Sequence, residues 1–248
     1  MANPNVIAPT AYGPMIVNIN DRYITREIFS DGYWARDDVR LLLSIVEHLL
    51  ATRERITVYD VGANIGTHCL ALAGLSPARV SVRAFEAQRQ VFHMLYGNMA
   101  LNGVRNVRCH HRAVSDTDGE TLTLNLPDYD RPNNFGGFEL IAPQRSDNAD
   151  MTRAGTDTVR TVTLDSFGEP VGLIKMDVEG MEDRALGGAR RTVAQHRPVC
   201  FVELTKTDSD FVQAYFREQA YRGYLRREDL IAIPAECNLG LAGLTQLF

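Results

Sequence analysis

The 248-residue sequence has few cysteines, a single tryptophan and no long apolar run. The four cysteines, Cys69, Cys109, Cys200 and Cys237, are far apart and form no C-x-x-C pair, which argues against a disulfide framework and against a zinc site. No segment approaches the roughly 18 apolar residues of a membrane span, and the first residues lack the pattern of a signal peptide. We therefore expect a cytoplasmic protein that does not associate with membranes.

Excess positive charge is also missing, since 26 Lys and Arg face 31 Asp and Glu, for a net charge of -5. A chain without a basic surface is not expected to bind nucleic acid through the phosphate backbone. A small molecule or a glycan suits this charge better. The hydrophobic content of 45% is enough for one large α/β core.

The chain divides into two parts by composition. Residues 1–36 are rich in Asn, Pro, Tyr and Gly, which indicates an irregular N-terminal arm with a short strand near residues 15–19, an arrangement compatible with a homodimer. Residues 37–248 have the pattern of one α/β domain. It begins with a helix over residues 37–50, where the charges of Asp37 and Asp38 favour a helix N-terminus.

Short β-type runs then alternate with helical patterns, which is typical of a parallel sheet wrapped by helices. The expected strands are residues 56–62, 80–87, 107–114, 171–178, 198–204 and 230–233, and the expected helices are 65–75, 88–102, 181–195 and 209–220. Residues 119–160 interrupt this order with turn formers and polar residues. A segment of this length inside a compact domain is usually a functional insertion or a lid.

The stretch "VYDVGANIGTHCLAL" joins the first of these strands to a helix through a glycine-containing turn. Gly62 and Gly66 flank Asn64 there, and missing Cβ atoms let a ligand approach the main chain. The exposed N–H groups suit an anionic group. A tight turn without a ligand is the alternative.

The next strand ends in "AFEA", which places Glu86 at its tip. An acidic side chain there can accept hydrogen bonds from both hydroxyls of a ribose. The turn reads D-x-G-x-N-x-G rather than the dinucleotide pattern G-x-G-x-x-G, which argues against a pyrophosphate. A cofactor with an amino-acid tail could use the N–H groups near Gly62 and the carboxylate of Asp60, and S-adenosylmethionine is such a cofactor.

These motifs, together with "GNMALNGVRNV", "RAVSD", "VTLDSF", "IKMDVEGMEDRALGGA" and "RPVCFVEL", resemble in order and spacing the FkbM family of class I S-adenosylmethionine-dependent methyltransferases. The resemblance covers about residues 56–204. It implies a Rossmann-like sheet of seven strands, one of them antiparallel, with helices on both faces. It also implies O-methylation of hydroxyls on sugars or natural products.

The same resemblance implies which residues bind the cofactor. The expected cofactor-binding residues are Asp60, Gly62, Asn64, Gly66, Glu86, Ala113 and Asp177. The sequence departs from many class I methyltransferases at the end of the third strand, where Ala113 and Val114 replace an acidic residue that binds adenine. Asp116 in the following turn is a candidate substitute.

A second group of charged residues, Lys175, Asp177, Glu179, Glu182 and Glu203, lies at the ends of two later strands. Strand alternation places the first three on one side, at the carboxyl edge where ligands bind. A carboxylate there can take the proton of an attacking hydroxyl. We expect Asp177 and Glu179 to act in catalysis, with Glu203 as a further candidate, while Glu182 has the alternative role of a helix N-terminal charge.

Three further features bear on chemistry. Paired carboxylates could instead bind Mg²⁺ or Ca²⁺, although we expect no metal. Among the histidines, His68 in the first turn of a helix is the catalytic candidate, whereas His110 and His111 should point to opposite faces of a strand. Trp34, Asn134 and Phe135 are the expected acceptor-binding residues, because aromatic rings attract a sulfonium and amides bind hydroxyls.

The leading hypothesis is a methyltransferase that uses S-adenosylmethionine to methylate a hydroxyl of a sugar or secondary metabolite. An NAD-dependent oxidoreductase shares the strand, turn and ribose acid and is one alternative. A binding protein that keeps the cofactor fold without turnover is the other. The identity of the acceptor has no signature in the sequence.

Overall fold

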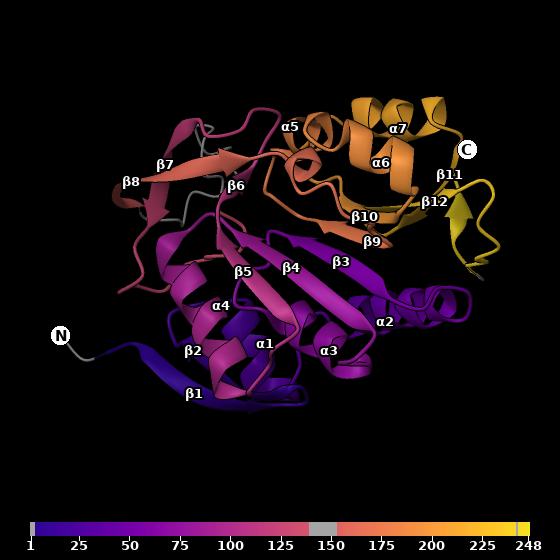
Figure 1. Ribbon diagram of the computed structural model, residues 1–248. Helices are drawn as coiled ribbons and strands as arrows, with labels where there is room; N and C mark the ends of the chain where they lie inside the picture. Colours follow the sequence, from indigo (N-terminus) through magenta and orange to yellow (C-terminus); the bar gives the residue numbers. More distant parts are fainter. Residues whose placement is uncertain (1–2, 139–152, 242) are drawn as a thin grey trace.

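The computed structural model describes residues 3–138, 153–241 and 243–248, and its centre is a mostly parallel sheet (Figure 1). The strand order is β13-β11-β12-β10-β9-β3-β4-β5. The strands are β3 (Ile56–Val61), β4 (Val80–Glu86), β5 (Val107–His111), β9 (Leu173–Met176), β10 (Val199–Glu203), β11 (Tyr221–Arg226), β12 (Asp229–Pro234) and β13 (Thr245–Gln246). Only β12 runs against its neighbours among the seven longer strands, and the two-residue β13 extends the edge. The expected Rossmann-like sheet is confirmed.

Helices cover both faces of this sheet (Figure 1). One face carries α2 (Arg36–Leu50), α3 (Thr67–Leu75) and α4 (Arg89–Leu101), and the other carries α5 (Glu182–Gly187), α6 (Arg190–His196) and α7 (Ser209–Glu218). Successive residues of a strand point to opposite faces, so Val58 belongs to one hydrophobic core and Tyr59 to the other. Both faces of β3 are therefore buried, as expected for the centre of a parallel sheet.

Several elements differ from the sequence expectation. The helix expected over residues 181–195 is two helices, α5 and α6, which meet near Gly188. A Cβ at Gly188 would lie 2.0 Å from the carbonyl oxygen of Ser115, so the chain passes too close for a side chain. The strand β11 was not expected at all. The strand expected over residues 107–114 is also divided, because β6 (Ala113–Val114) leaves the sheet to pair with β8.

The N-terminal residues are more ordered than the expected irregular arm. They form a hairpin of β1 (Asn5–Thr10) and β2 (Gly13–Asn18), followed by the helix α1 (Ile24–Asp31). Asn98 on α4 accepts a hydrogen bond from the N–H of Ile16 at 2.6 Å and donates one to the carbonyl of Ile65 at 2.8 Å. The hairpin is thereby tied to the segment that leads into α3.

The segment over residues 119–160 contains β7 (Thr121–Pro127) and β8 (Arg153–Val162), which pair in antiparallel fashion. The short helix η2 (Leu164–Ser166) follows. Residues 139–152 of the expected insertion lie outside the described residues. Before them, Asn133 bridges to Asp21, so this segment reaches the beginning of α1. Within the described ranges, no helix is both long and apolar enough to cross a bilayer.

Candidate functional site

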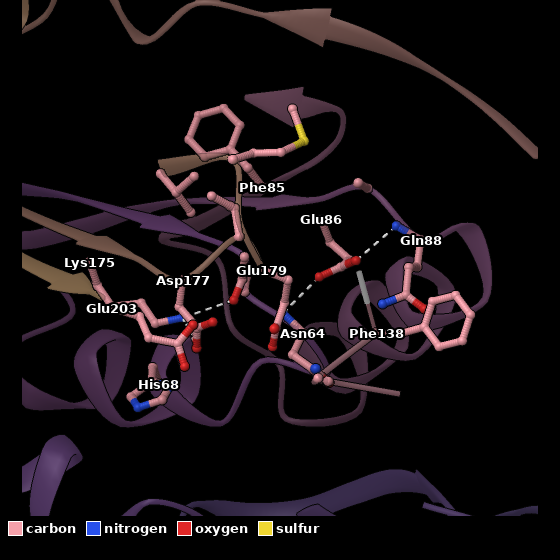
Figure 2. A pocket seen from close by; sticks show the side chains of 18 of the residues that line it. Asn64, His68, Phe85, Glu86, Gln88, Phe138, Lys175, Asp177, Glu179 and Glu203 are labelled. Carbon is pink, nitrogen blue, oxygen red and sulfur yellow. Dashed lines mark hydrogen bonds and ion pairs between the residues drawn. The ribbon is translucent and has the colours of Figure 1, made fainter. Parts of the chain in front are cut away.

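A cavity of about 350 Å³ lies at the carboxyl edge of the sheet, around the ends of β3, β4 and β9. The strand order reverses here, because β4 lies on one side of β3 and β9 on the other. Open α/β sheets bind ligands at this switch point. Figure 2 shows Glu86 towards one end of the cavity, and Asp177, Glu203 and His68 towards the other.

The turn between β3 and α3 forms one wall of the cavity. Gly62 has a positive φ of 77°, and a Cβ there would lie 1.7 Å from the carbonyl oxygen of Asp177, so only glycine fits. Asn64 also has a positive φ, of 49°, which asparagine tolerates better than most residues. Its N–H donates to Glu86 Oε2 at 3.0 Å. The turn therefore contacts the tips of both neighbouring strands.

Glu86 lies at the end of β4 with its carboxylate turned towards this wall. Oε2 accepts from Asn64, and Oε1 accepts from the N–H of Gln88 at 2.8 Å (Figure 2). Burial raises the pKa of Glu86 to about 7, although these two hydrogen bonds oppose the shift. The carboxylate also lines the cavity, where it can accept from a ligand hydroxyl.

The region beside Glu86 is apolar with one polar edge. Ala113 lines it, as expected, together with Phe138, which is fully buried. Gln88 provides the polar edge, and its side chain is fixed because it accepts from Tyr129 at 2.8 Å and donates to the carbonyl of Phe135 at 2.9 Å. A flat heteroaromatic ring with exocyclic polar groups matches this surface.

Lys175 lies behind the opposite end of the cavity and is only 3% exposed. Its ammonium donates to the carbonyl of Gly62 at 2.9 Å and lies 3.5 Å from a carboxylate oxygen of Asp60 and of Asp177. Burial disfavours the charged form, but the carboxylates of Asp177 and Asp60 outweigh burial and raise the pKa of Lys175. One buried cation thus joins the ends of β3 and β9.

Three carboxylates meet beside Lys175. Asp177, Glu179 and Glu203 each place one oxygen within 4.8 Å of the others, and all three line the cavity. Glu179 has a positive φ of 56° and forms an ion pair with Lys206. Lys206 also donates to the carbonyl of Gly137 at 2.6 Å, so it connects this trio to the wall formed by residues 133–138.

The crowding of these carboxylates changes their acidity. Burial, followed by the charge of Asp177, raises the pKa of Glu179 to about 8. Burial and the charges of Asp177 and Glu179 raise the pKa of Glu203 to about 9. Glu179 and Glu203 therefore hold protons near neutral pH and release them as the pH rises, which is suitable for acid-base chemistry.

Glu182 and His68 complete this end of the site. Glu182 is 1% exposed and accepts from the N–H groups of Val178 and Gly180 at 2.8 and 3.1 Å, so it holds the turn after β9. His68 lines the cavity, and burial followed by the charge of Lys175 lowers its pKa. A neutral imidazole is expected there.

Three of the expected site residues do not line the cavity. Asp60 is fully buried, and its carboxylate accepts from the thiol of Cys69 at 3.0 Å and pairs with Lys175. Gly66 faces α4, because a Cβ there would lie 2.7 Å from Leu95. Phe135 is 2% exposed and packs against Tyr129, with ring centroids 4.9 Å apart. We therefore infer that Asp60 acts on the site through Lys175.

The other expected residues line the cavity, namely Trp34, Gly62, Asn64, His68, Glu86, Ala113, Asn134, Asp177, Glu179 and Glu203. Asp116, the candidate for adenine binding, pairs instead with Arg184 at 3.2 Å. His110 and His111 stack on Phe85 and Phe92, which lie on opposite faces of the sheet, as alternation predicts.

The sequence did not identify several residues at the cavity wall, among them Tyr23, Thr67, Gln88, Phe138, Lys206 and Glu228. Phe138 ends the segment "NNFGGF", which also contains Phe135, and the sequence alone does not distinguish which of the two rings reaches the cavity. Lys206 and Glu228 lie in loops after strands, where no local pattern marks them.

The trio also has a donor set suitable for a divalent cation, since it offers three carboxylate oxygens. Two ammonium groups already neutralise it, however: Lys206 pairs with Glu179, and Lys175 lies 3.5 Å from Asp177. A bound cation would have to compete with both lysines. This charge balance favours the expectation of a site without metal.

Comparison with known proteins gives matches to methyltransferases. The model of the Methyltransferase FkbM domain matches residues 60–224. The 31-O-demethyl-FK506 methyltransferase FkbM of Streptomyces tacrolimicus is 27% identical over 201 residues, which cover 71% of this chain and 72% of that protein.

Solved structures with the same fold include Methyltransferase FkbM from Methylobacillus flagellatus, with a TM-score of 0.50 and 18% identity. The match covers 72% of this chain but 44% of that one, so this chain spans less than half of its length. The tRNA (uracil-54, C5)-methyltransferase of Pyrococcus abyssi, in complex with S-adenosyl-L-homocysteine, matches with a TM-score of 0.46 and 12% identity, over 94% of this chain and 44% of that one.

Proposed function

Because the chain belongs to the FkbM family of S-adenosylmethionine-dependent methyltransferases, we propose that it methylates a hydroxyl oxygen of a sugar or secondary metabolite. Membership of this family argues against the alternative that the chain is an NAD-dependent oxidoreductase. The Streptomyces relative is named for methyl transfer to 31-O-demethyl-FK506, which supports an oxygen acceptor in this chain as well.

The residues at the cavity fit S-adenosylmethionine. The Glu86 carboxylate lines the cavity and can accept from the ribose hydroxyls, and the apolar surface of Ala113 and Phe138 beside Gln88 suits adenine. The turn at Gly62 brings main-chain groups to the wall where the amino-acid tail would bind. The bound cofactor supplies a methyl group on a positively charged sulfur, which needs no further activation.

The contribution of the protein to the reaction is to hold the acceptor hydroxyl and remove its proton. The single observation that carries this proposal is the meeting of Asp177, Glu179 and Glu203 within 4.8 Å at the cavity wall. This trio would accept the proton of the acceptor hydroxyl while that oxygen is methylated.

The acceptor is expected to lie between the trio and the outer opening of the cavity. Trp34 and Asn134 line this side, and Asn134 Oδ1 is oriented by the N–H of Gly137 at 2.9 Å. An aromatic ring and an amide are suitable contacts for a sugar or a polyhydroxylated metabolite. We expect neither a nucleic acid nor a membrane to be a binding partner in this reaction.

The test is methyl transfer from labelled S-adenosylmethionine to a panel of glycosides and polyketide alcohols, with amines as the comparison class. The proposal predicts a labelled product whose NMR spectrum shows a methoxy group. Asp177→Asn should abolish transfer while retaining the cofactor, whereas Asp183→Asn, an exposed position on α5, should behave as the wild type. Methylation of amines alone would refute oxygen transfer, and cofactor binding without any turnover would support the non-catalytic alternative.

A further inference from the structure

The turn that follows β9 has a strained backbone. Glu179 has a positive φ of 56°, and the next residue, Gly180, has a φ of 98°. Glycine adopts this left-handed region freely and asparagine tolerates it, but a glutamate is strained there. Strained residues persist only where the surrounding structure holds them, and they cluster at functional sites. Some contact must therefore hold Glu179 in this conformation.

The carboxylate of Glu182 makes the contacts that hold the turn. Its Oε1 accepts a hydrogen bond of 2.8 Å from the N–H of Val178, and its Oε2 accepts one of 3.1 Å from the N–H of Gly180. These two N–H groups lie on either side of Glu179, so one carboxylate fixes the main chain before and after the strained residue. An amide of the same shape cannot do this, because it presents an NH₂ group to one of the two donors.

A favourable charge at the N-terminus of α5 does not by itself explain this arrangement. Glu182 is 1% exposed, and burial raises its pKa, so its position has an electrostatic cost. Asp183, the next residue, is exposed and lies in the same first turn, where it provides such a charge without that cost. The buried carboxylate is therefore better explained by the N–H groups from which it accepts.

The conformation of Glu179 determines where its carboxylate lies. The side chain lines the cavity, with one oxygen within 4.8 Å of oxygens of Asp177 and Glu203 (Figure 2). It also forms an ion pair with Lys206. A change from the left-handed to the right-handed region would turn the side chain in a different direction from the main chain, and the carboxylate would lose these partners.

We propose that Glu182 is a positioning residue for methyl transfer: by bridging the N–H groups of Val178 and Gly180, it keeps Glu179 in the left-handed conformation that places its carboxylate in the cavity. This inference rests on the proposed function only in that Glu179 is part of the proposed base. Glu182 is not one of the residues that line the cavity, so it acts through Glu179.

The first test measures melting temperatures and needs no acceptor. Glu182→Gln is introduced into two backgrounds, Glu179→Gln and Glu179→Gly, which both lack the carboxylate but differ in whether the left-handed backbone is strained. Since glycine needs no restraint there, we expect the decrease in melting temperature caused by Glu182→Gln to be roughly half as large, or less, in the glycine background. Equal decreases would overturn the proposal, because a helix N-terminal charge would act equally in both backgrounds.

The second test is a crystal structure of the Glu182→Gln variant. We expect a negative φ at Glu179 and the loss of its ion pair with Lys206, because one of the two restraining hydrogen bonds is gone. An unchanged φ together with an intact ion pair would show that the turn does not depend on Glu182 and would overturn the proposal.

Turnover connects this conformation with catalysis. With an acceptor that is methylated, Glu182→Gln should lower kcat roughly tenfold or more, while the Kd of S-adenosylhomocysteine stays within about twofold of the wild type. The matched control is Asp183→Asn, which should keep the wild-type kcat. A wild-type kcat in Glu182→Gln would refute the positioning role. If no acceptor is methylated, the proposed function fails, whereas the melting temperatures and the crystal structure still decide the role of Glu182.

Discussion

The ammonium of Lys175 donates a hydrogen bond of 2.9 Å to the carbonyl oxygen of Gly62. This contact joins the end of β9 to the turn after β3, the two elements between which the strand order reverses. The same ammonium neutralises Asp60, which is fully buried, and lies 3.5 Å from Asp177 at the cavity. The geometry of the turn at Gly62 and the position of Asp177, part of the proposed base, therefore depend on one buried cation.

Removal of that cation should destabilise the fold. Lys175→Met leaves the carboxylate of Asp60 buried without a counter-charge, and such a loss typically costs about 3–5 kcal/mol of unfolding free energy. Urea denaturation would measure the change. The double variant Lys175→Met/Asp60→Asn should recover a large part of the stability, because the buried charge is removed. A single variant as stable as the wild type would show that the pair has no such role.

Gly62→Ala should disrupt the cofactor turn. The new Cβ would lie 1.7 Å from the carbonyl oxygen of Asp177, and alanine is strained at a φ of 77°. We expect S-adenosylhomocysteine binding to be lost in calorimetry, with a decrease in melting temperature. The matched control is Gly74→Ala in α3, where nothing lies within 4 Å of the new Cβ and helix propensity should improve. Wild-type affinity in Gly62→Ala would contradict the described turn.

The rate should rise with pH through the titration of Glu179 and Glu203. Groups with raised pKa values, about 8 for Glu179 and about 9 for Glu203, are protonated below these values and become bases above them. The kcat/KM profile, which reports the free enzyme, should therefore increase between pH 7 and 9. A pH-independent kcat/KM would exclude the trio as the base.

Metal chelation should leave the rate unchanged. Lys175 and Lys206 already neutralise the carboxylates that would otherwise bind a cation. Assays in EDTA, with Mg²⁺ or Ca²⁺ added back, would measure this directly. Loss of activity in EDTA with recovery on added cation would show that the trio binds metal in the active enzyme.

The sequence predicted the fold well because its strongest signals are local. The apolar runs before Gly62 and before Asp177 are central strands buried on both faces, and their order along the chain determines the parallel sheet. β11, by contrast, has Arg222 and Arg226 at half-buried positions in its pattern, so it lacks the apolar run of a central strand. The break near Gly188 depends on the approach of Ser115, which is distant in sequence.

The sequence could predict which side chains reach the cavity where the position of a residue along a strand determines the direction in which its side chain points. Glu86 and Asp177 lie at strand ends that share one edge of the sheet, so both reach the cavity. Gly66 was assigned to the cofactor, yet its missing side chain serves packing against α4, and spacing cannot distinguish these two uses. Likewise, the sequence does not show that Asp60 faces Lys175, because that contact joins two strands far apart in the chain.

The central claim is that the cavity at the switch point binds S-adenosylmethionine with its ribose on Glu86. Calorimetric titration of S-adenosylhomocysteine into wild type, Glu86→Gln and Glu47→Gln tests it most directly, because Glu47 is an exposed acid on α2 that carries the same charge. We expect Glu86→Gln to raise the Kd by roughly ten- to hundredfold, which is the usual effect of losing hydrogen bonds to a charged group. Glu47→Gln should leave the Kd unchanged. Wild-type affinity should also decrease as the pH falls below about 7, where Glu86 becomes protonated. Equal affinity in all three proteins would contradict the placement of the cofactor in this cavity.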